Sequence, residues 1–412
     1  MSTSTSSAYV WVWLPGAMEP VPAGVLQLRG DSLWFNYGTR YLARPDAVSL
    51  YTPELPLGNT WAGPTADLGM PGTIRDGSPD AWGRRTIISS LTGKRGDDVD
   101  TTDLSELTYL LESGSNRFGA LDFQKSATDY IPRTDTATVD ELHYAAELIE
   151  AGEKIPPGLA DALLSGTAIG GARPKALIED GGVQYIAKFS TASDSYSVVG
   201  AEAASIVLAR IAGIRVPNAR VVTSLGKDIL LIERFDRVGA NQRRMTVSGL
   251  TILGLGEMGS RHGTYPQLLD ALRKHTAEPS LVGEELFRRI AFNIAISNTD
   301  DHLRNHAAFW DGYNLELTPA YDLSPMNRSG DTATQILAFG RDGERESNFI
   351  SLVKCSHVYG LSKPKAREII DAMVQSIREN WKSAAEHARL SETDRAFLWG
   401  RQILNPAASY GY

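Results

Sequence analysis

The chain has 412 residues, of which 42% are hydrophobic and 22% are charged. This length exceeds the roughly 250–300 residues at which single hydrophobic cores stop growing, so the sequence predicts two or three packed units. The net charge of −8 argues against a protein that coats nucleic acid, and the single cysteine, Cys355, excludes an intramolecular disulfide or a cysteine-rich zinc site.

The sequence pattern offers no signal for export. Residues 1–5 lack the basic residues with which a signal peptide begins, and the apolar stretch 8–14 is too short and too aromatic for one. No run of about 18 apolar residues occurs, so no membrane span is expected. A single cysteine is typical of proteins in a reducing compartment, and we therefore expect a cytoplasmic protein with no membrane partner.

Residues 1–130 are predicted to form a small mixed α/β subdomain. Short β-type runs alternate with turns rich in glycine and proline, and a helical stretch follows near Trp82–Leu91. The runs are Tyr9–Leu14, Gly24–Leu28 and Ser32–Tyr37. Between residues 124 and 138 the chain becomes rich in serine, threonine, aspartate and proline, which places a boundary near residue 130.

Residues 131–237 have the layout of the N-terminal lobe of a kinase. Thr138 and Glu141 have the spacing of a capping box, which predicts the start of an amphipathic helix. Strands are expected at Val183–Phe189, Ala219–Thr223 and Asp228–Phe235, with a helix across Ala201–Ile211.

Residues 238–412 are predicted to be mainly helical. After a cap at Ser362, apolar residues recur at the spacing of one helix face. They are Ala366, Ile369, Ile370, Met373, Ile377 and Trp381. The sequence thus predicts an α+β, protein-kinase-like fold with two lobes, the first of mixed α/β structure and the second mainly helical.

The segment from Asn298 to Asn305 carries residues suited to phosphoryl transfer. That reaction needs a carboxylate at the acceptor hydroxyl, oxygen ligands for Mg²⁺ and a cation on the nucleotide. Asp300 and Asn305 stand five residues apart, as in a kinase catalytic loop, and Asp322 follows seventeen residues later. This pattern makes Asp300 the candidate base, and it makes Asn305 and Asp322 the candidate metal ligands.

A structural interpretation of the same residues stays open, because aspartate and asparagine commonly cap helices and line turns. The apolar helix pattern from Leu286 to Ile294, which leads directly into the polar cluster, favours the catalytic interpretation. Consecutive carboxylates cannot point at one hydroxyl. We therefore expect Asp301 to be a loop or capping residue whose alanine variant keeps much of its activity.

Upstream features could bind a nucleotide. A loop of small residues could let backbone amides approach a triphosphate, although such turns are commonly structural. Its residues are Gly170, Gly171, Ala172, Arg173, Pro174 and Lys175. Lys188 in a strand and Glu202 in a helix match the pair that holds the phosphate-binding amine of kinases, but each also fits a surface charge. The strand end at Glu233 and Phe235 fits either a buried strand reaching the surface or an adenine-binding hinge.

Together these motifs resemble those of the HipA family of bacterial serine/threonine kinases, the toxins of toxin–antitoxin pairs, over nearly the whole chain. The resemblance implies ATP and Mg²⁺ as cofactors. For the nucleotide, it matches Gly170–Lys175 to the phosphate loop, Lys188 to the nucleotide lysine and Glu233-Arg234-Phe235 to the adenine-binding hinge. For the reaction centre, it matches Asp300 to the catalytic base and His302 to a nucleotide-site residue. Asn305 and Asp322 match the magnesium ligands. Ser78–Arg84 and Asn116–Leu121 resemble architectural segments of the family.

Two departures from the family pattern matter. Family members often carry a serine seven residues before the loop lysine, where autophosphorylation ejects the loop and inactivates the enzyme, but this chain has Ala168 there. Thr167 and Ser165 lie close by. Asp322 is followed by Leu323 rather than by the phenylalanine of eukaryotic kinases, so switching through that ring is not expected.

The resemblance also implies partners. They are a protein substrate such as an aminoacyl-tRNA synthetase, whose phosphorylation restrains translation and growth, and a HipB-type helix-turn-helix antitoxin, through which alone the chain would contact DNA. Two alternatives stay open. One is a small-molecule phosphotransferase of the aminoglycoside or choline kinase type, which uses a similar loop. The other is a catalytically weak kinase that acts as an antitoxin-bound transcriptional corepressor.

Overall fold

The computed structural model describes residues 6–65, 68–93, 100–102, 104–134, 137–153, 156, 159, 173–191, 194–239, 241–327, 330 and 332–412. The chain divides into two compact units. Unit 1 comprises Met1–Thr191, Val222–Val247 and Phe309–Tyr313, and unit 2 comprises Ala192–Val221, Ser248–Ala308 and Asn314–Tyr412. The finer division of the sequence at residues 130 and 237 remains a prediction.

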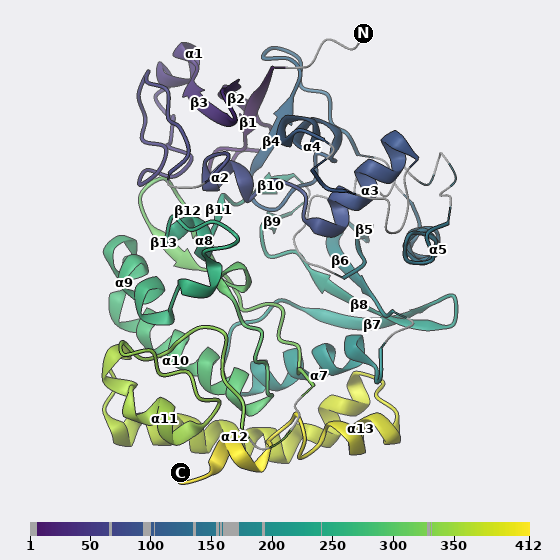
Figure 1. Ribbon diagram of the computed structural model, residues 1–412, viewed down its shortest axis with the longest axis vertical. Coiled ribbons are helices and arrows are strands. Elements are labelled where there is room, and N and C mark those ends of the chain that lie inside the picture. The colour runs from purple at the N-terminus through teal and green to yellow at the C-terminus, as the bar shows by residue number, and fades with distance from the viewer. Residues whose placement is uncertain are drawn as a thin grey trace. The chain divides into compact units, whose positions relative to one another are not determined.

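The first sheet of unit 1 is antiparallel, in the order β3-β2-β1-β4 (Figure 1). Its strands are β1 (Ser7–Val12), β2 (Val21–Arg29), β3 (Ser32–Tyr37) and β4 (Leu121–Gln124). Buried and partly buried residues alternate along β3, as expected for a strand with one face on the core. The three runs predicted as strands near the N-terminus therefore coincide with β1, β2 and β3.

The second sheet has the order β5-β6-β8-β7 and carries several predicted site residues. Its strands are β5 (Lys175–Asp180), β6 (Val183–Phe189), β7 (Ala219–Ser224) and β8 (Lys227–Glu233). The helices of unit 1 are α1 (Thr39–Leu42), α2 (Gly72–Arg75), α3 (Ala81–Thr92), α4 (Glu106–Glu112) and α5 (Val139–Glu150). Trp82 of α3 and Leu142 of α5 share a hydrophobic core with Phe189 of β6, and the predicted capping box of Thr138 and Glu141 is present.

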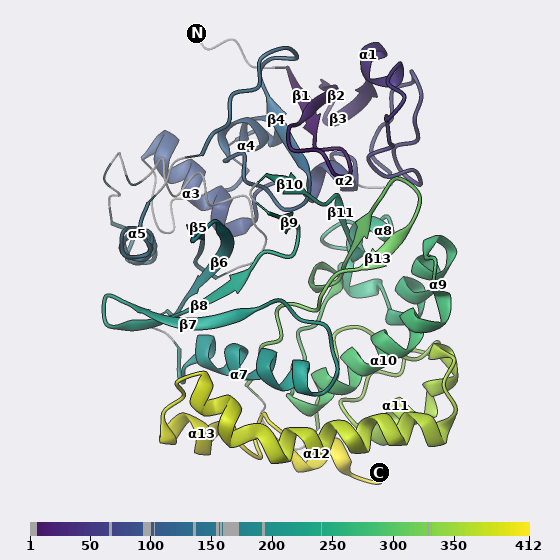
Figure 2. The same cartoon turned by 180° about the vertical axis from the view of Figure 1, so that it is seen from behind.

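Unit 2 is mainly helical, as predicted. Its helices are α7 (Val198–Ile211), α8 (Gly249–Ile252), α9 (Tyr265–His275), α10 (Pro279–Ala295), α11 (Phe349–Lys354), α12 (Lys363–His387) and α13 (Glu392–Leu398). All six apolar residues predicted for one face of α12 are buried, and Ser362 caps the helix by accepting a hydrogen bond from the Lys365 amide. Figure 2 shows α12 running alongside α7, against which it packs.

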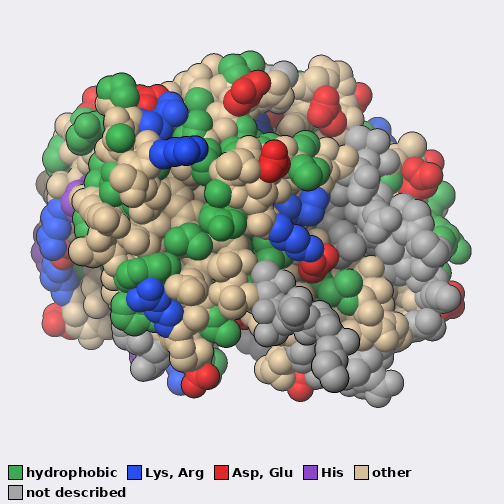
Figure 3. Space-filling model, turned by 90° about the horizontal axis from the view of Figure 1, so that it is seen from above, with side chains coloured by type: hydrophobic (Ala, Val, Ile, Leu, Met, Phe, Trp, Pro, Cys, Tyr) green, Lys and Arg blue, Asp and Glu red, His purple; other side chains and the backbone are tan. Residues whose placement is uncertain are grey.

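Short elements complete the fold. The strands are β9 (Arg237–Val238), β10 (Gln242–Arg243), β11 (Thr246–Ser248), β12 (Ala307–Trp310) and β13 (Leu315–Leu317). Short 3-10 helices are η2 (Ser260–His262), η3 (Leu303–Asn305), η4 (Ser356–Tyr359) and η5 (Pro406–Ser409). Within the described residues, no helix combines the length and the apolar composition that a bilayer span requires. On the face shown in Figure 3, charged side chains of both signs are interspersed with hydrophobic ones.

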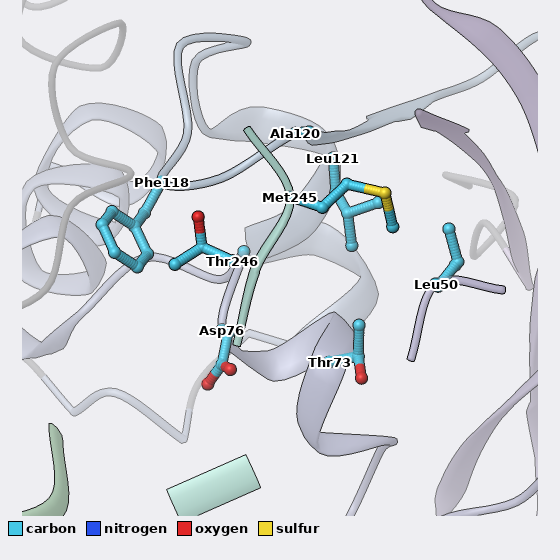
Figure 4. A pocket seen from close by; sticks show the side chains of 9 residues that line it. Leu50, Thr73, Asp76, Phe118, Ala120, Leu121, Met245 and Thr246 are labelled. Carbon is cyan, nitrogen blue, oxygen red and sulfur yellow. The ribbon is translucent and has the colours of Figure 1, made fainter. Parts of the chain in front are cut away.

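A small cavity lies in unit 1 between α2 and the segments around Phe118 and Met245 (Figure 4). Its volume is about 10 Å³, which is enough for about one water molecule and far below the several hundred Å³ of a cofactor pocket. Leu50 and Thr73 line it, and none of the predicted site residues does. The cavity is therefore a packing feature of unit 1 and not the candidate active site.

Candidate active site

The predicted catalytic loop follows helix α10 directly in the chain. Leu286, Ile290 and Ile294 are fully buried, which confirms the apolar face expected ahead of the polar cluster. The helix ends at Ala295, and Ser297 takes a left-handed conformation with φ of 54°. The Asn298 amide then donates to the Asn293 carbonyl over 2.8 Å, so the loop starts directly from the buried end of α10.

Asp300 and Asp301 point in opposite senses. The Asp300 side chain is exposed, whereas Asp301 is 3% exposed. The Asp301 carboxylate accepts hydrogen bonds from Asn293 Nδ2 over 2.7 Å and from the Tyr265 hydroxyl, and it lies 2.9 Å from His306 Nε2. Asp301 is a loop residue, as expected, but alanine at this position would strip a buried polar cluster of its acceptor. The effect of that change on activity remains a prediction.

The electrostatics of the loop suit a base at position 300. Partial desolvation raises the pKa of Asp300, the charges of Asp322 and Asp301 raise it further, and His302 opposes them. Burial and the Asp301 charge raise the pKa of Tyr265 well above its usual range, so its hydroxyl stays protonated and donates. His302 is half-buried, and its Nδ1 has no hydrogen-bond partner among the described residues.

The predicted metal ligands lie on two segments that meet within unit 2. The Tyr321 hydroxyl donates to the Arg304 carbonyl over 2.7 Å, which brings the neighbours of Asp322 and Asn305 together. Asn298 Nδ2 donates to the Asp322 carbonyl over 3.4 Å. Asp322 has φ of 60°, a left-handed conformation that is uncommon outside glycine and tends to occur at functional sites.

The donor set fits a hard cation such as Mg²⁺. Asn305 is 7% exposed, and its Nδ2 lies 3.5 Å from the Asp300 carbonyl, so the amide oxygen faces away from that contact. The oxygen of Asn305 and the carboxylate of Asp322 are the ligand types that Mg²⁺ prefers. Two protein ligands do not fill the coordination shell of Mg²⁺. Sites with so few protein ligands are typical of Mg²⁺ that is also bound by substrate phosphates.

Neighbouring backbone holds the loop from two sides. The Ile336 amide donates to the Thr299 carbonyl over 3.1 Å, and the Gly249 amide donates to the His306 carbonyl over 2.7 Å. A Cβ on Gly249 would lie 2.7 Å from the Leu303 carbonyl oxygen, closer than real Cβ atoms come to backbone. Position 249 thus requires glycine for the close approach of α8 to the loop.

The predicted nucleotide residues of unit 1 are only partly described. Gly170, Gly171 and Ala172 lie outside the described residues, as do Ser165, Thr167 and Ala168. Lys175 and Lys188 are register partners on the antiparallel strands β5 and β6. Lys175 is 5% exposed, and its Nζ lies 3.6 Å from Asp80 Oδ2.

Asp80 is also the cap of α3, since its Oδ1 accepts from the Gly83 amide over 2.7 Å. The two oxygens of this carboxylate therefore serve different partners. The ion pair of Asp80 with Lys175 could not be expected from the sequence, because the two residues are far apart along the chain.

The remaining predicted residues are Glu202, Glu233 and Phe235. Glu233 ends β8, and the ring of Phe235 makes edge-to-face contacts with Phe118 and Phe309, each with 5.8 Å between ring centroids. Glu202 is 3% exposed within α7 of unit 2. The structure thus gathers Asp300, His302, Asn305 and Asp322 in unit 2, whereas Lys175, Lys188, Glu233 and Phe235 belong to unit 1.

A buried charge network next to the predicted hinge was missed by sequence reasoning. Asp236, 1% exposed, accepts from Arg234 Nη2 over 2.8 Å, from Arg237 Nη1 over 2.9 Å and from the Gly119 amide over 2.7 Å. Burial alone would raise the pKa of Asp236, but the two arginines outweigh it and lower the pKa to about 2. Arg234 also donates to the Asn116 side chain, so the network ties the hinge to the segment that begins there.

Comparisons with known proteins agree with this fold. A family model described as HipA-like C-terminal domain matches residues 167–381. No curated protein matches the chain. A solved structure described as the Shewanella oneidensis MR-1 toxin antitoxin system HipA, HipB and its operator DNA complex matches with a TM-score of 0.69 and 18% identity, over 98% of each chain. This match confirms the mixed α+β fold of the HipA type that the sequence predicts.

A more distant structural match is the Helicobacter pylori proinflammatory kinase CtkA. It has a TM-score of 0.36 and 14% identity, over 56% of this chain and 93% of that chain. At this distance the likeness carries no argument about the present chain.

Proposed function

Because the chain belongs to the HipA-like family, we propose that it is an ATP- and Mg²⁺-dependent serine/threonine protein kinase that acts as the toxin of a toxin–antitoxin pair. The observation that carries the proposal is the arrangement of the catalytic loop. Asp300 is exposed in the loop that follows helix α10, and Asn298 ties this loop to the segment of Asp322. A carboxylate beside two oxygen ligands is the set that phosphoryl transfer requires.

Each residue of the loop has one role in this proposal. Asp300 accepts a hydrogen bond from the acceptor hydroxyl and takes its proton, a task that its raised pKa favours. Asn305 and Asp322 present oxygens to the metal. Together with the phosphates they would hold Mg²⁺, which would supply positive charge to stabilise the transferring phosphoryl group.

The lysine pair of unit 1 supports the use of a nucleotide. Side chains directly opposite each other on antiparallel strands lie about 4.5–5.5 Å apart at Cβ, and like charges there are destabilising. Lys175 and Lys188 nevertheless occupy such a pair, with the Asp80 carboxylate near Lys175. This concentration of positive charge suits the phosphates of ATP.

Replacing Lys188 with alanine is expected to weaken ATP binding by roughly 10-fold or more, about 1.4 kcal/mol, because a cation on the phosphates is lost. Titration calorimetry with ATP and magnesium measures this. Lys227→Ala is the matched control, because Lys227 lies on the same sheet but pairs with Glu147 at the surface. Wild-type affinity in Lys188→Ala would contradict the assignment, and equal affinity with magnesium and with a chelator would remove the metal roles.

The proposed partners follow from the family. The Shewanella protein is described in a complex with HipB and operator DNA, and we propose a HipB-type antitoxin for this chain, with DNA contacted only through it. The proposed substrate is a protein such as an aminoacyl-tRNA synthetase, in the cytoplasm. Mass spectrometry of cells that express the wild type or Asp300→Asn tests this. New phosphoserine or phosphothreonine sites confined to the wild type are expected, and identical phosphosites in both would contradict it.

A further inference from the structure

The carboxylate of Asp301 is the centre of a buried polar cluster in unit 2. Its Oδ2 faces the Tyr265 hydroxyl, Asn293 Nδ2 and His306 Nε2. These groups come from the start of α9, from α10 and from the residue that follows η3. The rings of Tyr265 and His306 also meet edge to face, with 5.4 Å between centroids. One carboxylate oxygen thus connects three separate elements.

The cluster reaches both segments of the candidate active site. Asn293, which donates to Asp301, accepts through its Oδ1 from Asn298 Nδ2 over 3.1 Å. The same Asn298 amide group lies 3.4 Å from the Asp322 carbonyl. A continuous chain of hydrogen bonds therefore runs from Asp301 through two asparagines to the segment of the predicted metal ligand.

The buried Asp301 carboxylate anchors the loop directly beside Asp300. Asp301 is 3% exposed, whereas the side chain of the adjacent Asp300 is exposed, so fixing the backbone at Asp301 constrains the position from which Asp300 projects. The side chain of Asp301 is 4% exposed, and a buried carboxylate is held firmly because losing its donors leaves it without compensation. The rate of catalysis depends strongly on the position of the catalytic group, since a misplacement of about 1 Å can lower the rate by ~10²-fold.

We infer that Asp301 is a positioning residue of phosphoryl transfer, which holds Asp300 toward the acceptor and the Asp322 segment in register through Tyr265, Asn293 and His306. Asp301 touches neither substrate nor metal in this role. The inference rests on the proposed function, because it names a residue that serves the same reaction.

The test replaces one donor of the cluster and one matched hydroxyl outside it. Tyr265→Phe removes the donor to Asp301, and Tyr359→Phe removes an equally buried hydroxyl that donates to the Phe339 carbonyl over 2.7 Å. We expect kcat to fall by roughly 10–100-fold in Tyr265→Phe, with ATP affinity unchanged, because a loosened loop misplaces the base. Tyr359→Phe should keep the wild-type kcat and ATP affinity.

A second pair of variants tests the carboxylate itself. Asp301→Asn keeps an acceptor oxygen and should retain more kcat than Asp301→Ala, while both variants bind ATP like the wild type. Equal kcat in Asp301→Asn and Asp301→Ala, or a wild-type kcat in Tyr265→Phe, would overturn the positioning role. If the role of Asp301 were purely structural, the variants would give less folded protein. The kcat per folded molecule would then not be higher in Asp301→Asn than in Asp301→Ala.

Hydrogen exchange separates this inference from the proposed function. Amides of the loop from Thr299 to Leu303 should exchange faster in Tyr265→Phe than in the wild type or in Tyr359→Phe, because the anchor of the loop is weakened. If the wild type transfers no phosphate, the proposed function fails. The hydrogen-exchange data alone then decide whether Tyr265 and Asp301 anchor the loop. Unchanged protection of the loop in Tyr265→Phe would then overturn the inference.

Discussion

Replacing Asp300 with asparagine is expected to lower the rate of phosphoryl transfer by ~10²–10⁴-fold, the range of a general base, and to leave ATP binding at the wild-type level. The side chain of Asp300 is exposed and directed away from the buried cluster that holds Asp301, so the change removes a proton acceptor without disturbing the fold. Single-turnover transfer and ATP titration measure the two effects separately.

The control for this variant is Asp342→Asn, which neutralises another exposed carboxylate of unit 2 and should leave the rate unchanged. The pKa of Asp300 is raised, so the wild-type rate should fall as pH decreases through a value above that of an ordinary aspartate. An active Asp300→Asn would contradict the assignment of the base, and with it the spacing argument from Asp300 to Asn305.

Replacing Asp236 with alanine is expected to lower the free energy of unfolding by about 3–5 kcal/mol, because Arg234 and Arg237 would stay buried without their shared carboxylate. Both arginine side chains are almost inaccessible, at 0% and 4% exposure. The denaturation curve of the full chain, followed by circular dichroism, measures the change.

Asp46→Ala is the matched control, since Asp46 forms a surface ion pair with Arg44 over 2.8 Å, and exposed pairs contribute little to stability. The pH dependence has a definite sign. The folded pKa of Asp236 is about 2, below its ordinary value, so its stabilisation is complete above about pH 4 to 5 and is lost as pH falls toward 2. Equal destabilisation by the two variants would contradict a stabilising network at the hinge.

Elements with strong local patterns were predictable from the sequence. The long helix α12 followed from its apolar spacing and its serine cap, and α5 followed from the capping box at Thr138. Both signals arise from neighbours within one or two turns, so a single sequence contains them. The polar loop after α10 was found in the same way, because its residues are adjacent in the chain.

The features that the sequence did not reveal depend on partners far apart in the chain. Asp236 is paired with backbone more than a hundred residues upstream, at Gly119, and the orientation of Asp301 depends on Tyr265. No local pattern shows which of two consecutive aspartates turns inward. Glycine at position 249 is required only because α8 passes close to Leu303, which is again a tertiary contact.

The proposed kinase activity is tested most directly by transfer of the γ-phosphate label of ATP. Wild-type protein and Asp300→Asn are incubated with labelled ATP and magnesium, one set with bacterial lysate protein and another with aminoglycosides and choline. Label on lysate protein that appears only with the wild type and only with magnesium is predicted. Label confined to the small molecules, or ATP bound with no label on any acceptor, would contradict a protein kinase and favour a small-molecule phosphotransferase or a catalytically weak corepressor, respectively.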